Sequence, residues 1–123
     1  MLARSALALL LLASMHAHAQ TVVIYSRADA AQAERAHRLA LLYGPALIDR
    51  QLSPGVPWRA TIASHICAAN RVLLLWSASA AASTEVRREI DTALQCRRPV
   101  VPVLLDSTPL PGLVADVQAV DWR

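Results

Sequence analysis

The sequence contains no lysine and no phenylalanine, and it has only three glycines in 123 residues. The glycine-based motifs G-x-G-x-x-G, the P-loop and G-x-S-x-G are all absent, and so is the zinc motif H-E-x-x-H. These absences exclude a hydride-transfer enzyme that holds its dinucleotide in a Gly-rich turn. They also exclude the common hydrolase and kinase classes.

Without lysine, the formal net charge of +3 comes from arginines, which are scattered along the chain. No basic stripe forms, so a nucleic-acid partner is not expected. Hydrophobic residues make up 55% of the chain and charged residues 17%, which excludes a disordered tail as the main content. The length then predicts one compact domain.

Residues 1–19 have the three parts of an export signal. Arg4 gives a positive start, residues 5–15 form a leucine-rich run too short to span a bilayer of about 30 Å, and residues 17–19 offer small residues for cleavage. We expect cleavage after Ala19 and a secreted or periplasmic domain over residues 20–123. A buried first helix and an uncleaved membrane anchor are the alternatives.

After this signal, β-branched apolar runs alternate with segments of helical periodicity. Short uncharged runs predict strands over residues 21–26, 46–48, 71–76, 99–105 and 119–122. Apolar residues at helical spacing predict helices between them, beginning near Asp29, Pro57 and Ser83, with Asp29 and Gln32 as a capping box. Residues 77–82 are expected to form a loop.

This alternation predicts a doubly wound α/β domain with a parallel sheet and right-handed crossovers. Ligands of such sheets bind outside the carboxyl ends of the strands. The loops expected at that edge are residues 26–29, 49–57, 77–83 and 106–111.

Several motifs, in order and spacing, resemble a bacterial-type Toll/interleukin receptor (TIR) domain along nearly the whole predicted mature chain. They are residues 24–29, residues 49–55 followed by Trp58, residues 74–77 followed by Ser83, residues 89–90 and 93–94, and residues 98–106 followed by residues 109–111. The resemblance implies a flavodoxin-like parallel sheet of five strands.

The sequence departs from the family pattern at two places. Glu85 and Val86 stand where the family often has tryptophan and cysteine, and the sequence stops at Arg123, where the family usually continues into a last helix. We therefore expect a sheet without that final helix.

The resemblance implies one of two functions: cleavage of the nicotinamide–ribose bond of NAD⁺, or binding to other TIR domains in signalling. The nicotinamide leaving group is already cationic, so one carboxylate that stabilises the oxocarbenium-like ribose suffices. Glu89 is that carboxylate by its position in the family motif. The alternative is a solvated helix glutamate that pairs with a neighbouring arginine.

Four further residues are candidates for NAD⁺ contacts. Arg50 suits a pyrophosphate and Trp58 a stacked base, with Ser26 and Ser83 as polar neighbours. Each has a plainer alternative: a solvated arginine, a core tryptophan, and serines that cap a helix or a turn. We expect no metal and no bound cofactor, with NAD⁺ only as substrate.

Cys67 and Cys96 match no zinc spacing and lie on predicted helices among apolar residues. We expect two free, buried thiols; the alternative is that an exported protein oxidises the pair. Export itself favours the interaction module over NAD⁺ cleavage, because NAD⁺ is chiefly an intracellular metabolite.

Overall fold

The computed structural model describes residues 2–3, 20–48 and 57–123. Its strands, in chain order, are β1 (Leu2–Ala3), β2 (Thr21–Ile24), β3 (Ala46–Ile48), β4 (Arg71–Trp76), β5 (Val100–Leu104) and β6 (Ala119–Asp121). Its α-helices are α2 (Ala30–Leu41), α3 (Trp58–Ala68), α4 (Ala78–Ala82) and α5 (Thr84–Gln95), and two 3₁₀ turns are η1 (Arg27–Asp29) and η3 (Gly112–Val114).

All strand pairs are parallel, and the sheet order is β1-β6-β5-β4-β2-β3. The five strands from β2 onward follow the flavodoxin-like order, with the switch point between β2 and β4. This confirms the predicted fold class. The two-residue β1 was not predicted, and it lies within the expected export signal.

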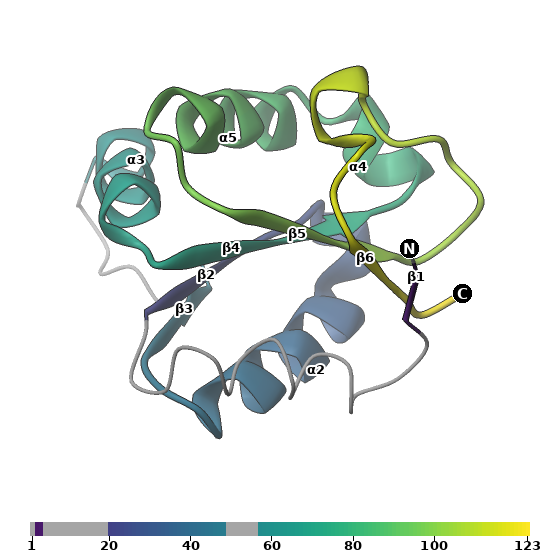
Figure 1. Ribbon diagram of the computed structural model, residues 1–123. Helices are drawn as coiled ribbons and strands as arrows, with labels where there is room; N and C mark the ends of the chain where they lie inside the picture. Colours follow the sequence, from purple (N-terminus) through teal and green to yellow (C-terminus); the bar gives the residue numbers. More distant parts are fainter. Residues whose placement is uncertain (1, 4–19, 49–56) are drawn as a thin grey trace.

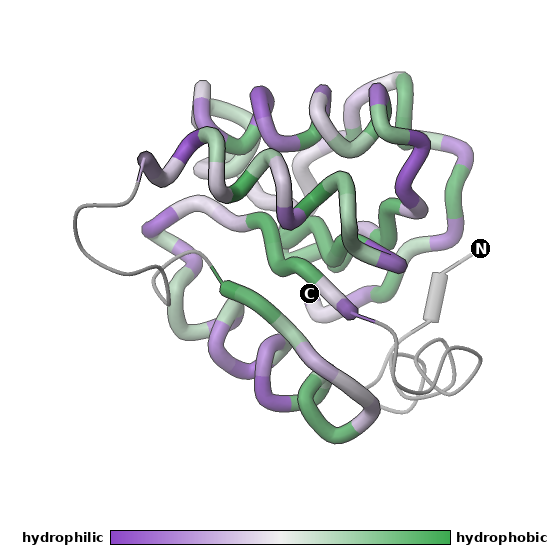
Figure 2. The backbone as a smooth tube through the Cα atoms, turned by 90° about the vertical axis from the view of Figure 1, so that its left-hand side faces the viewer, coloured by the Kyte–Doolittle hydropathy of each residue, from purple (hydrophilic) through white to green (hydrophobic). Residues whose placement is uncertain are grey.

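Helices cover both faces of the sheet (Figure 1). On one face α3, α4 and α5 pack over a core that includes Ile66, Val72 and Leu74, and on the other α2 packs over Val23, Leu73 and Val103. Figure 2 shows hydrophobic segments running between the helix layers. β6 is the last element among the described residues.

Pro102 lies inside β5, between two neighbouring strands. In a parallel strand successive residues direct their N–H and C=O groups to alternate sides. The Leu104 carbonyl accepts from Trp122 on the β6 side, so Pro102 faces that side too. The β5–β6 pairing begins only at Val103, so the missing N–H of Pro102 leaves no ladder bond unmade.

Two local predictions were wrong. The expected loop over residues 77–82 contains helix α4, because Ser77 Oγ accepts from Ala80 N (3.1 Å) and the alanines that follow favour helix. The capping box at Asp29 does not form, because the Asp29 carboxylate instead accepts the Ser77 hydroxyl (2.5 Å).

Candidate functional site

A groove runs between α3 and α5, and Glu89 lies along it. We call it the α3-side groove; its lining residues include Trp58, Arg59, Ile62, Glu85, Arg88 and Glu89. Glu89 is half-buried, on the turn before Ile90, which packs into the core. The structure therefore brings together two of the predicted site residues, Glu89 and Trp58.

Trp58 is the first residue of α3, and 40% of it is exposed. The plainer alternative for Trp58, a core tryptophan, is wrong: Ile62 and Ile66 anchor the helix, one and two turns further on, and both are buried. The Arg59 guanidinium lies 5.3 Å from the centroid of the Trp58 ring. An exposed indole at a groove mouth is suited to stacking against a flat ligand.

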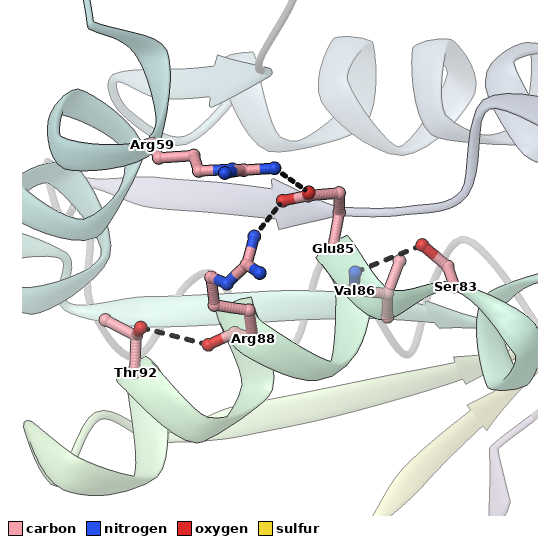
Figure 3. Close-up of polar contacts among 6 residues, drawn as sticks. All are labelled: Arg59, Ser83, Glu85, Val86, Arg88 and Thr92. Carbon is pink, nitrogen blue, oxygen red and sulfur yellow. Dashed lines mark hydrogen bonds and ion pairs between the residues drawn. The ribbon is translucent and has the colours of Figure 1, made fainter.

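Glu85 joins the two walls of this groove. Its carboxylate accepts from Arg59 Nη2 on α3 (2.8 Å, to Oε1) and from Arg88 Nη1 on α5 (2.8 Å, to Oε2), as Figure 3 shows. These hydrogen bonds, chiefly that from Arg59, lower the pKa of Glu85. The charge of Glu85 is thus neutralised by two cations, one turn from Glu89.

Arg59 and Arg88 were not among the predicted site residues. Arg88 follows Glu85 at a spacing of three, which suggested only a local helix pair. Their shared carboxylate depends on how α3 packs against α5, which no local pattern in the sequence records. Each guanidinium has five N–H donors, so it keeps donors for an anion while it holds Glu85.

The other predicted site residues lie elsewhere. Ser83 caps α5, since its Oγ accepts from Val86 N (3.2 Å; Figure 3), which confirms the plainer alternative. Ser26 precedes η1, where its carbonyl accepts from Asp29 N, and it does not line the α3-side groove. Arg50 and most of the loop over residues 49–57 lie outside the described residues.

The carboxyl edge of the sheet holds a second polar cluster, at the switch point. Here the hydrogen bond from Ser77 to Asp29 links the segments that follow β4 and β2. Asp106, after β5, accepts from Ala78 N and Thr108 N (2.9 Å each). The pKa of Asp106 is lowered, chiefly by a hydrogen bond from the Thr108 hydroxyl and then by these two backbone hydrogen bonds. The carboxylates therefore fix the loops at this edge.

Cys67 and Cys96 form a disulfide, so the prediction of two free thiols was wrong. Each was interpreted as a buried hydrophobe on its own helix. In the structure both are only half-buried, and their Cα atoms lie 5.3 Å apart where α3 and α5 end side by side. That separation is within the usual range for a bridge.

The cavity volume of the α3-side groove is about 40 Å³, far below the 300–1,000 Å³ typical of sites that enclose a small molecule. The described part of the groove is thus an open surface rather than a closed pocket. Among the described residues no three His, Cys, Asp or Glu side chains gather as a metal ion requires. No helix in that part of the chain is long and apolar enough to cross a membrane.

The sheet order, the switch point and the helices on both faces define a flavodoxin-like α/β domain. The sequence model of the family described as TIR domain matches residues 22–123, and the chain belongs to that family. No curated protein matches the chain. Among solved structures, the TIR domain of the Toll-related receptor TRR-2 from Hydra magnipapillata is similar. The two chains are 16% identical, and the match covers 83% of this chain and 82% of the receptor domain with a TM-score of 0.72. The similarity is therefore one of fold.

Proposed function

We propose that this TIR domain cleaves the nicotinamide–ribose bond of NAD⁺, with Glu89 as the essential carboxylate. The observation that carries the proposal is that Glu89, an exposed indole and two arginines line one groove. A dinucleotide presents the matching groups: a ribose that becomes cationic, a flat base and a pyrophosphate. Each group has a counterpart within this groove.

In this mechanism Glu89 stabilises the positive charge that develops on the ribose as the bond to nicotinamide breaks. The bonding electrons leave with the nicotinamide, which becomes neutral and needs no proton. Water then adds to the ribose carbon and releases a proton, so that NAD⁺ and water give nicotinamide, ADP-ribose and H⁺. Arg59 and Arg88 hold the pyrophosphate through their remaining N–H donors. Arg50, which lies outside the described residues, stays a predicted pyrophosphate contact.

Nicotinamide release by the purified domain tests this proposal. The domain is mixed with NAD⁺, and free nicotinamide and ADP-ribose are measured by chromatography against a protein-free control. We expect the two products in equal amounts. Absence of nicotinamide release from folded, concentrated protein would overturn the proposal.

A second candidate function is association with another TIR domain, without catalysis. The Cys67–Cys96 disulfide favours it, because disulfides persist in oxidising compartments, where NAD⁺ is scarce. The disulfide also supports the predicted export, whereas cleavage after Ala19 stays a prediction from the sequence. Mass spectrometry of the exported protein should find Gln20 at its amino terminus, and an intact chain in the cytosol would contradict export.

A further inference from the structure

A second groove lies on the other side of α5, between that helix, α4 and the segment around η3. We call it the η3-side groove. In Figure 1 the yellow turn near residue 113 lies on the same face of the sheet as α4 and α5. The inner wall of the groove includes the buried apolar side chains of Trp76, Ala80 and Ile90. The cavity volume of the groove is about 90 Å³, larger than the value of about 40 Å³ for the α3-side groove.

The wall opposite α5 is held in place and is apolar at its edge. Trp76 Nε1 donates to the Pro109 carbonyl (2.9 Å), which fixes the start of this segment against the sheet. Pro111 and Leu113 then line the groove, and Leu113 is 78% exposed. A leucine this exposed gains almost nothing from folding, so it is available to be buried by a partner.

The α5 wall carries one charge of each sign, Arg87 and Asp91, one turn apart and both exposed. Neither makes an ion pair within the described part of the chain, in contrast to Glu85 and Arg88 on the other side of the same helix. The rim of the η3-side groove therefore carries two charged side chains without ion-pair partners in the described part of the chain, next to the exposed Leu113.

We propose that the η3-side groove binds a second copy of this chain across a two-fold axis. With the two α5 helices antiparallel, Arg87 faces the partner's Asp91, and Asp91 faces the partner's Arg87. The same contact buries Leu113 of both copies over the apolar walls. In a two-fold contact the same surface of both copies must be complementary to itself. Arg87 and Asp91, one turn apart, meet this requirement because they form two equivalent ion pairs across the axis.

A second copy fits this rim better than a partner of one charge sign. An acidic partner would meet Asp91, and a basic partner would meet Arg87, so each would face one repulsion. The antiparallel copy meets none. The inference rests on the second candidate function, association of TIR domains, and it is independent of NAD⁺ cleavage at Glu89.

Sedimentation equilibrium of the full chain tests the proposal, and circular dichroism checks that every variant folds. We expect the wild type to dimerise. Leu113→Glu should weaken the dimer about ten-fold or more, because it brings charge into the apolar centre of the contact. Glu34→Gln, on α2 across the sheet, is the matched control and should leave the dimer unchanged.

Charge exchange at the rim gives the sharper result. Arg87→Glu puts a second acid opposite the partner's Asp91, and Asp91→Arg puts a second base opposite the partner's Arg87, so each variant alone should dimerise weakly. Mixed together, the two variants restore opposite charges at both contacts and should form a heterodimer of nearly wild-type affinity.

Each possible outcome has a distinct meaning. A wild type that stays monomeric at the highest soluble concentration would overturn the proposal. If Leu113→Glu and both rim variants dimerise like the wild type, the copies associate through another surface, and the proposal for the η3-side groove is overturned. Nicotinamide release is measured in a separate experiment, so failure of one proposal does not affect the test of the other.

Discussion

Helix α5 separates two grooves that differ in how their side chains are paired. On the α3 side, Glu85 holds Arg59 and Arg88, and the Cys67–Cys96 disulfide joins the ends of the two helices. On the η3 side, Arg87 and Asp91 have no ion-pair partner within the described residues, and Leu113 is exposed. A preorganised polar groove suits binding and chemistry, whereas an unsatisfied amphipathic one suits association with another protein.

The largest effect on stability should come from the disulfide that joins α3 to α5. The bridged residues are 29 apart in sequence, and closing a loop of that length stabilises a domain by about 3–4 kcal/mol. The double variant Cys67→Ser, Cys96→Ser should lose roughly that much free energy of unfolding in urea. Dithiothreitol should destabilise the wild type similarly and leave the double variant unchanged. Ready thiol labelling of the denatured protein without prior reduction would contradict the bridge.

Trp58 should affect the binding of NAD⁺ more than its cleavage. It is exposed at the mouth of the α3-side groove, so Trp58→Ala removes a stacking surface and no core packing. The KM for NAD⁺ should rise about ten-fold, equivalent to about 1.4 kcal/mol, with kcat nearly unchanged. Trp58→Phe should recover most of the loss, and a wild-type KM in Trp58→Ala would place the base elsewhere.

The smallest effect concerns the pH dependence conferred by Glu85. Its pKa is lowered in the folded state, chiefly by the hydrogen bond from Arg59, so its contribution to stability is present above the unfolded pKa of about 4.3. That contribution disappears as the pH falls through the lower folded pKa. Glu85→Gln should therefore be slightly less stable than wild type at pH 7 and equally stable once the carboxylate is protonated in both states, as urea unfolding would measure. A difference that persists in acid would show that Glu85 acts through packing instead.

The sequence predicted the architecture well because strands and helices follow from local periodicity. The buried runs over residues 71–76 and 100–104 could only be central strands, and Ser83 was identified as a helix cap from local chemistry alone. What it could not predict are contacts between elements. The disulfide and the Glu85 ion pairs both depend on α3 lying against α5, which no single helical pattern encodes.

The candidate site was predicted in part for the same reason. Glu89 was located by the family motif, and the structure places it in a groove with Trp58. Arg59 and Arg88 were missed because an arginine on an amphipathic helix looks the same whether it is solvated or shared across a groove. Leu113 gave no signal either, since one leucine in a loop indicates nothing until its neighbours in space are known.

The central claim is that the α3-side groove is catalytic through Glu89, and one comparison tests it most directly. Nicotinamide release is measured for the wild type, for Glu89→Gln and for the control Glu34→Gln, whose helix α2 covers the opposite face of the sheet (Figure 1). Glu89→Gln keeps the size and polarity of the side chain but loses the charge, so the rate should fall about 100-fold or more, with Glu34→Gln at the wild-type rate. Equal, measurable release by wild type and Glu89→Gln would contradict the account.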